Sequence, residues 1–217
     1  MSKRRLPMFP LETVLFPSTV LPLRVFEPRY RKMLEDLLVG SREFGVVLIE
    51  RGSEVGGGEA RSGIGTLARV LEARESGGGH WTVVAVGLQR ILVDQWLPDD
   101  PYPLAEVRPF PDHSGPGVDP TSYATLRDQL HHLIDGLVAL GEANPSNNAE
   151  IAEDPALGSL QMAALAPLAS FDRQRILEVN RVEDRCRLLG DLLSEAQELV
   201  DLRLRAGEGG AASWTPR

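Results

Sequence analysis

Residues 6–30, LPMFPLETVLFPSTVLPLRVFEPRY, decide the fold of this chain. From Thr13 to Phe26, β-branched and apolar residues alternate with prolines, a pattern that favours edge strands and loops over a central strand. Glu27-Pro28 then starts a helix, because proline at the first helical position gives up no hydrogen bond. The stretch therefore predicts a strand that turns into a helix at a proline corner.

The helix that starts at Pro28 has one apolar face. Apolar residues recur at helical spacing, and Gly40 provides a stop; the face consists of Tyr30, Met33, Leu34, Leu37 and Leu38. This is the only helix expected in the first half of the chain.

Further strands surround this helix in the sequence. The run FGVVLI at residues 44–49 is apolar and rich in β-branched residues, as buried strands are. A glycine-rich turn at residues 75–79 indicates a hairpin. The remaining strands are expected at residues 64–73, 81–87, 90–96 and 104–107.

The second half of the chain changes to a helical period. Four prolines (Pro109, Pro111, Pro116 and Pro120) mark the boundary. Asp119-Pro120 and Asp154-Pro155 are helix starts, each with an acidic cap before a first-turn proline. Ser170 is expected to cap a short helix, and a long helix follows it. We expect domains at residues 1–112 and 119–206, and a disordered tail at residues 207–217.

The composition restricts the classes of function. The chain has 217 residues, 42% of them hydrophobic, and a net charge of −8, so a basic nucleic-acid-binding surface is not expected. Cys186 is the only cysteine, which excludes an internal disulfide and makes a zinc site improbable. Prolines and charges interrupt the apolar N-terminal stretch, so we expect neither a signal peptide nor a membrane span, and a cytoplasmic protein.

Catalytic and cofactor motifs are weak in this sequence. The only lysines, Lys3 and Lys32, do not follow a glycine-rich phosphate loop. Residues 63–68, GIGTLA, lead into a strand, whereas a dinucleotide site needs glycines that lead into a helix. His131-His132 point about 100° apart on a helix, and the DHS run at residues 112–114 cannot form a catalytic relay. No cofactor, metal ion or catalytic residue is expected.

Several segments, in order and spacing, carry a family resemblance. They are LPMFPL (6–11), VLFP (14–17), LPL (21–23), FEPRYR (26–31), FGVV (44–47), GTLA (65–68), VGLQR (86–90) and AEV (105–107). The chain resembles the N-terminal, substrate-binding domain of Lon proteases. The resemblance implies an α+β fold, a PUA-like β pseudobarrel with one embedded helix followed by a C-terminal α-helical bundle. The ATPase module and the Ser/Lys dyad of full Lon proteases are not expected here.

The resemblance implies a non-catalytic module that binds unfolded or apolar polypeptide segments, or an adaptor for a protease in trans. The residues expected at the peptide site are Phe9, Phe16, Phe26, Glu27, Pro28, Arg29 and Tyr30. For the phenylalanines, burial in the core is the competing interpretation, and Glu27 and Arg29 could instead brace the helix start. An RNA-binding PUA-like protein is the alternative function, which the acidic composition disfavours.

Overall fold

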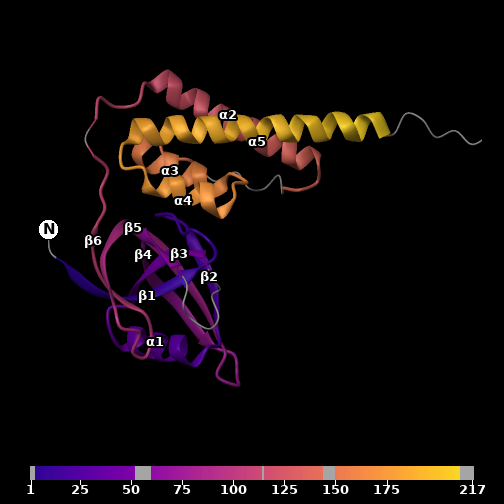
Figure 1. The fold of residues 1–217 in the computed structure, drawn as a ribbon. Coiled ribbons are helices and arrows are strands. Elements are labelled where there is room, and N and C mark those ends of the chain that lie inside the picture. The colour runs from indigo at the N-terminus through magenta and orange to yellow at the C-terminus, as the bar shows by residue number, and fades with distance from the viewer. Residues whose placement is uncertain (1–2, 52–59, 114, 144–149, 211–217) are drawn as a thin grey trace, which may run out of the picture. The chain divides into compact units, whose positions relative to one another are not determined.

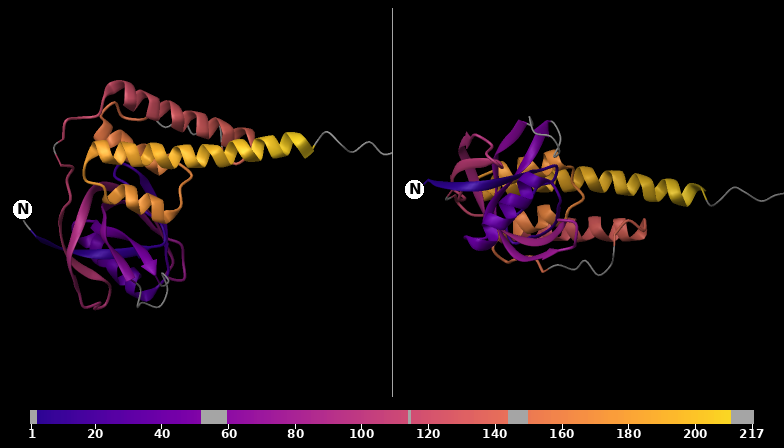
Figure 2. Two further views of the ribbon diagram at one scale, coloured as in Figure 1. Left: turned by 45° about the horizontal axis from the view of Figure 1, so that its top comes forward. Right: turned by 90° about the horizontal axis from the view of Figure 1, so that it is seen from below.

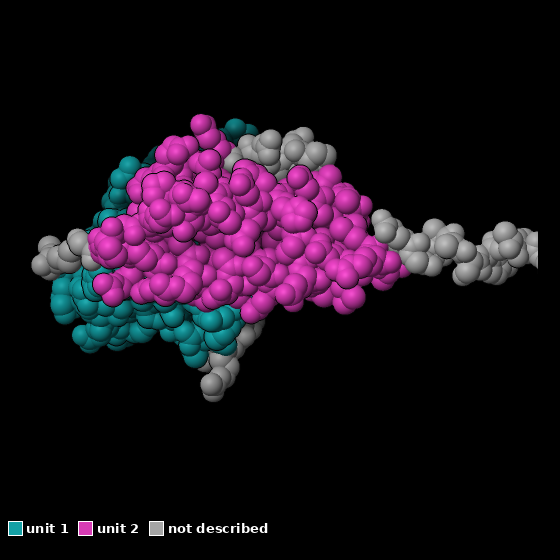
Figure 3. Space-filling model, turned by 90° about the horizontal axis from the view of Figure 1, so that it is seen from above, with its two compact units in different colours: residues 1–113, 170–180 teal, residues 114–169, 181–217 magenta. Residues whose placement is uncertain are grey.

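The computed structural model describes residues 3–51, 60–113, 115–143 and 150–210. They form two compact units, coloured separately in Figure 3. The first unit comprises residues 1–113 and 170–180, and the second comprises residues 114–169 and 181–217. The chain therefore enters the second unit, returns to the first for one short segment, and leaves it again.

Six strands and two helices make up the described part of the first unit (Figure 1). The strands are β1 (Arg4–Leu11), β2 (Val20–Val25), β3 (Glu43–Arg51), β4 (Ala60–Glu75), β5 (Trp81–Leu97) and β6 (Leu104–Pro109). Their order is β2-β5-β4-β3-β1-β6, and an additional pairing between β5 and β6 closes the sheet on itself. β2 lies outside this ring and pairs with β5 alone among the strands described.

Helix α1 (Pro28–Val39) lies against one end of the strands (Figures 1 and 2). Its buried face is the one that the sequence predicts, formed by Tyr30, Met33, Leu34 and Leu37. These side chains join one apolar cluster with residues of the sheet such as Phe9, Leu21 and Phe44. A second apolar cluster of buried strand residues includes Met8, Leu67 and Ile91.

Helix α4 (Ser170–Glu178) packs with the sheet, although it follows two helices of the second unit in sequence. Arg90 of β5, only 4% exposed, donates to the carbonyls of Leu177 and Val179 at 2.8 and 2.7 Å, and to Asp112 at 2.5 Å. Carbonyls at the C-terminal end of a helix have no partner within the helix, and a guanidinium is suited to bind two of them.

A second polar contact holds the middle of α4. The buried Gln174 amide donates to Ser62 Oγ at 2.7 Å, to the Ile64 carbonyl at 3.0 Å and to Glu178 at 2.8 Å. At the helix start, Ser170 Oγ donates to the Glu12 carbonyl at 2.9 Å. Three separate hydrogen-bonded points thus fix α4 to the strands.

The second unit consists of α2 (Pro120–Ala139), α3 (Pro155–Leu165) and α5 (Val182–Gly210). α2 and α5 run side by side in the same direction, with Leu126 close to Gly190 and Gly136 close to Val200 (Figures 1 and 2). Asp119 and Asp154 cap α2 and α3 as expected, accepting from the backbone N–H of Ser122 and Ala156. The fully buried Arg185 donates to Ser159 Oγ and the Ala156 carbonyl, which joins α5 to α3.

The structure adds one strand to the elements expected from the sequence and corrects three other details. Residues 4–11 form a strand despite Pro7 and Pro10, because β1 pairs with β6 through its first half and with β3 through its second. Residues 81–87 and 90–96 belong to one strand, β5, not two. Residues 170–180 belong to the unit of the strands, whereas we expected them in the helical domain at residues 119–206. The expected disordered tail begins too early, since α5 continues to Gly210; residues 211–217 lie outside the described part.

Candidate functional site

The corner between β2 and α1 contains five of the seven residues that the sequence places at a peptide site. β2 ends at Val25 and α1 begins at Pro28, so that Phe26 and Glu27 make the turn. Arg31 N donates to the Glu27 carbonyl at 2.9 Å, which starts the helical hydrogen bonding. Pro28 occupies the first turn of the helix, as expected.

Of the four aromatic candidates, three belong to the core. Phe9 stacks on Tyr30 with ring centroids 4.2 Å apart, and both side chains are buried in the cluster beneath α1. Phe16 is 1% exposed. These three side chains are buried and do not line an open surface.

Phe26 differs from the other three, since it is 54% exposed. Its ring lies beside the imidazole of His80, with centroids 6.5 Å apart and planes inclined by 27°. Single exposed apolar side chains are common on protein surfaces, so this exposure makes the Phe26 ring accessible to a ligand without requiring one. Phe26 is the aromatic candidate that remains available for binding.

Glu27 and Arg29 interact with each other. Arg29 Nε lies 3.2 Å from Glu27 Oε2, and the guanidinium carbon lies 4.6 Å from the centroid of the Tyr30 ring. Both charged side chains are about 20% exposed. The pair therefore braces the helix start, which is the structural alternative considered for these residues, while still bordering the surface.

A pocket of about 440 Å³ opens beside Phe26. It is lined by Arg24, Val25, Phe26, Ser76, Gly77, His80, Trp81 and Thr82. Strand register explains this grouping, because Arg24 pairs with Thr82 and Val25 with Trp81. The end of β2 and the start of β5 thus form two sides of the pocket.

The turn between β4 and β5 forms the third side. Gly77, Gly78 and Gly79 all have positive φ angles of 75°, 64° and 75°, a backbone region that other residues rarely adopt. Ser76 N donates to the His80 carbonyl at 2.7 Å and closes the turn. This turn directs His80 toward Phe26.

The sequence analysis did not predict Arg24, His80 and Trp81 as residues of the site. The glycine-rich turn was visible as a hairpin signal, but the pairing of β2 with β5 joins segments about sixty residues apart. Single-sequence periodicity carries no information about such a pairing. One local signal was present for Arg24. Side chains of a strand alternate between its two faces, and this alternation in residues 20–25 places Arg24 on the outer face of an otherwise apolar strand.

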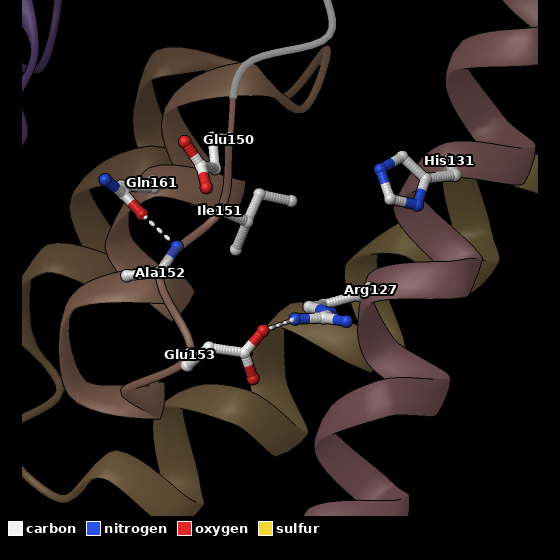
Figure 4. Close-up of a pocket in the computed structure, with 7 residues that line it drawn as sticks. All are labelled: Arg127, His131, Glu150, Ile151, Ala152, Glu153 and Gln161. Carbon is white, nitrogen blue, oxygen red and sulfur yellow. Dashed lines mark hydrogen bonds and ion pairs between the residues drawn. The ribbon is translucent and has the colours of Figure 1, made fainter.

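A second pocket, of about 610 Å³, lies in the second unit (Figure 4). Its polar groups are largely engaged with one another: Arg127 pairs with Glu153 at 3.1 Å, and Gln161 accepts from Ala152 N at 2.8 Å. His131, on α2, lines the opposite wall and is exposed, as is His132. None of the seven expected residues lies in this pocket.

The described residues offer neither a metal centre nor a membrane span. Within residues 3–51, 60–113, 115–143 and 150–210, no group of three His, Cys, Asp or Glu side chains could hold a metal ion. In the same part of the chain, none of the helices combines the length and apolar character needed to cross a bilayer. Cys186 is buried, and the GIGTLA run lies inside β4, as expected.

The model of a known domain, the substrate-binding domain of ATP-dependent protease La (Lon), matches residues 5–195. The chain belongs to this family. The Lon resemblance found in the sequence is thereby confirmed, and it extends beyond the strands into α5.

Curated relatives of this Lon-family chain are Lon proteases of greater length. The Lon protease of Anaeromyxobacter dehalogenans is 28% identical over 202 residues, which cover 91% of this chain and 24% of that protein. Lon protease 2 of Sorangium cellulosum is 28% identical over 204 residues, which cover 91% and 25%. The chain thus spans about a quarter of the length of these relatives.

Two solved structures have the same fold as the Lon-family chain. A Lon N-terminal domain protein from Xanthomonas campestris matches with a TM-score of 0.62 and 24% identity, covering 86% of this chain and 96% of that one. The N-terminal domain of a Mycobacterium avium complex Lon protease matches with a TM-score of 0.62 and 18% identity, covering 88% and 98%. The α+β fold with six strands is therefore that of Lon N-terminal domains, and the RNA-binding alternative receives no support.

Proposed function

We propose that this Lon-family chain binds exposed apolar segments of other polypeptides, and that the pocket beside Phe26 receives one of their side chains. The observation that carries the proposal is the 54% exposure of Phe26 above a pocket, in a family whose matching model is described as a substrate-binding domain. Aromatic side chains in pockets are frequent anchors of protein interfaces, because they exclude much water for little loss of conformational freedom.

The outer edge of β2 supports the same proposal. Among the strands described, β2 pairs with β5 only, so its other edge offers backbone groups to an extended segment. Addition of a strand to such an edge is a common way to bind peptides, with backbone hydrogen bonds for affinity and pockets for specificity. Val20 is 62% exposed at the start of β2, and the pocket lies at its end.

Of the residues first proposed, we retain Phe26 as the contact and assign Glu27, Pro28 and Arg29 to the shape of the corner. Phe9 and Tyr30 lie in the apolar cluster beneath α1, and Phe16 is also buried. Arg24, His80 and Trp81 join the proposed site.

The proposal also covers what the chain does not do. Its lysines are restricted to Lys3 and Lys32, so the lysine of a Ser/Lys dyad or of a phosphate loop is not provided by residues 33–217. We propose a non-catalytic, cytoplasmic module that binds segments for itself or presents them to a protease in trans. Purified protein should neither shorten casein nor hydrolyse ATP; turnover that copurifies with the chain would contradict this part.

Fluorescein-labelled casein, an unfolded polypeptide, provides the test of binding. Phe26→Ala should weaken the anisotropy titration roughly tenfold, the effect of losing an aromatic anchor. Val39→Ala is the matched control, because Val39 is 92% exposed on α1 and lies outside the pocket. Equal affinities of both variants and the unchanged protein would remove the pocket from the proposal, and absence of binding would remove the function.

A further inference from the structure

The pocket beside Phe26 is basic, although the chain as a whole is acidic. The sequence has 31 acidic and 23 basic side chains, a net charge of −8. The residues that line the pocket include Arg24 and His80 and contain no acidic side chain. Arg24 therefore supplies the positive charge among the residues that line this pocket.

Arg24 is distinguished from its neighbours by its lack of an acidic partner. Arg29 is paired with Glu27, and Lys32 with Asp36 at 2.7 Å. Arg74, on β4, is paired with Glu72. Arg24 forms no ion pair within 4.0 Å with any residue that the structure describes, and its side chain is exposed at the pocket.

A second guanidinium lies next to the same turn. A Cβ atom at Gly79 would collide with the guanidinium of Arg31, so this group fits against the turn only because residue 79 is glycine. Arg31 Nε is buried and has no hydrogen-bond partner among the residues described. Two acidic residues border this region: Glu27, which is paired with Arg29, and the exposed Glu75, which pairs with Trp81 in the sheet.

We propose that this pocket selects segments in which a carboxylate stands next to an apolar side chain. The inference rests on the proposed function. The apolar side chain packs against Phe26 and Trp81, and the neighbouring Asp or Glu carboxylate accepts from Arg24, with Arg31 adding positive potential. A guanidinium donates charge-assisted hydrogen bonds to carboxylates in a fixed geometry, which suits it to this discrimination.

The test uses the full chain and four fluorescein-labelled Gly/Ser peptides with a central Phe-Glu, Phe-Gln, Phe-Lys or Ala-Glu pair. Phe-Glu should bind roughly fivefold more tightly than Phe-Gln, the effect of one partly exposed ion pair, and Phe-Lys should bind least among the Phe peptides. Raising the salt to about 1 M should abolish the preference, because the Debye length falls to about 3 Å. Ala-Glu should bind weakly.

Arg24→Gln assigns the preference to the pocket. It should remove most of the preference for Phe-Glu over Phe-Gln, and the small remainder should be the part that Arg31 contributes. Arg5→Gln is the control, since it removes an exposed positive charge outside the pocket from the same unit. Gly79→Ala should also reduce the preference by displacing Arg31, whereas Gly78→Ala, with a similar positive φ and only His80 nearby, should not.

The outcomes separate this inference from the proposed function. Equal binding of Phe-Glu, Phe-Gln and Phe-Lys, with casein still bound, overturns the carboxylate preference and leaves polypeptide binding in place. A preference that is undiminished in Arg24→Gln overturns the assignment to this pocket. Failure of casein and all four peptides to bind overturns both. The comparison among peptides on the unchanged protein is decisive even if a variant fails to fold.

Discussion

Arg90 and Arg24 belong to the same unit, and the surroundings of the two guanidinium groups are opposite. Arg90 is 4% exposed, and it donates to two carbonyls of α4 and to Asp112, with its guanidinium 4.9 Å from the centre of the Phe110 ring. Arg24 is exposed at a pocket without an ion pair to any described residue. The guanidinium of Arg90 is bound to other groups of the fold, whereas the guanidinium of Arg24 can still donate hydrogen bonds to a ligand.

The difference teaches how to separate structural from functional residues in this chain. A buried guanidinium is costly unless its donors are satisfied, so Arg90 and its acceptors depend on one another for folding. An exposed guanidinium contributes little to stability and can change its partner. Variants should therefore divide into those that unfold the first unit and those that alter only binding.

The largest effect is expected for Arg90→Ala. It leaves Asp112 and two carbonyls of α4 without their donor, and removal of one partner of a buried pair costs about 3–5 kcal/mol. Trp81 and Trp96 both lie in the first unit, so their fluorescence during urea unfolding reports on it. A decrease of less than about 1 kcal/mol in the free energy of unfolding would show that α4 does not depend on Arg90. Arg90 would then not differ from Arg24 in its importance for stability.

Gln174→Ala should have the next largest effect. It removes the donor to Ser62, the Ile64 carbonyl and Glu178 in a buried position, at a cost of about 1–3 kcal/mol. Arg175→Ala on the same helix is the control, because its ion pair with Asp172 is exposed and worth about 0.5 kcal/mol. Equal urea midpoints for the two variants would argue against docking of α4 through its buried face.

Glu43 provides an intermediate case, since it binds Arg69 at 2.6 Å and Arg4 at 2.7 Å and so links β3 to β4 and β1. The Arg69 hydrogen bond, supported by Arg4, holds the pKa of the Glu43 carboxyl below its ordinary value, against the opposing effect of burial. A lowered folded-state pKa stabilises the protein above the unfolded-state pKa, and this stabilisation is lost as pH falls through the folded-state pKa.

Glu43→Gln should therefore lower the free energy of unfolding by about 1 kcal/mol at neutral pH. The difference from the unchanged protein should shrink progressively in acid. Urea titrations at several pH values below neutrality measure this convergence. A difference that stays constant into acid would mean that the carboxylate charge is irrelevant to the contact.

Arg24→Gln should have the smallest effect on stability, within about 0.5 kcal/mol, because an exposed side chain without an ion pair is replaced by another polar one. Its thermal melt should overlay that of the unchanged protein while most of the preference for Phe-Glu peptides is lost. A melting temperature lowered by several degrees would place Arg24 with Arg90 among the structural residues.

The sequence predicts most elements of this fold because their signals are local. The apolar face of α1, the glycine turn before Trp81 and the Asp-Pro helix starts are each decided by neighbouring residues. The position of α4 is not local, since it depends on Arg90 and Gln174 reaching across more than eighty residues of sequence. The hydrophobic periodicity of α4 and of the strands does not indicate that they contact each other.

The candidate site was predicted in part for the same reason. The motif around residues 26–31 identified the corner, but its aromatic residues divide between core and surface. Tyr30 faces inward along the buried side of α1, while Phe26 precedes the helix and faces out. The residue types alone do not show that Tyr30 is buried and Phe26 is exposed. Arg24, His80 and Trp81 become neighbours only through the β2–β5 register.

Hydrogen exchange of the full chain with and without saturating casein tests the central claim most directly, because it locates the bound polypeptide on the protein. The account predicts slower exchange in peptides that cover residues 20–27 and 76–83, with unchanged exchange in residues 120–139 and 155–165. Backbone amides at a strand edge exchange slowly once a segment covers or pairs with them. Protection confined to the helices of the second unit, with residues 20–27 and 76–83 unaffected, would contradict it.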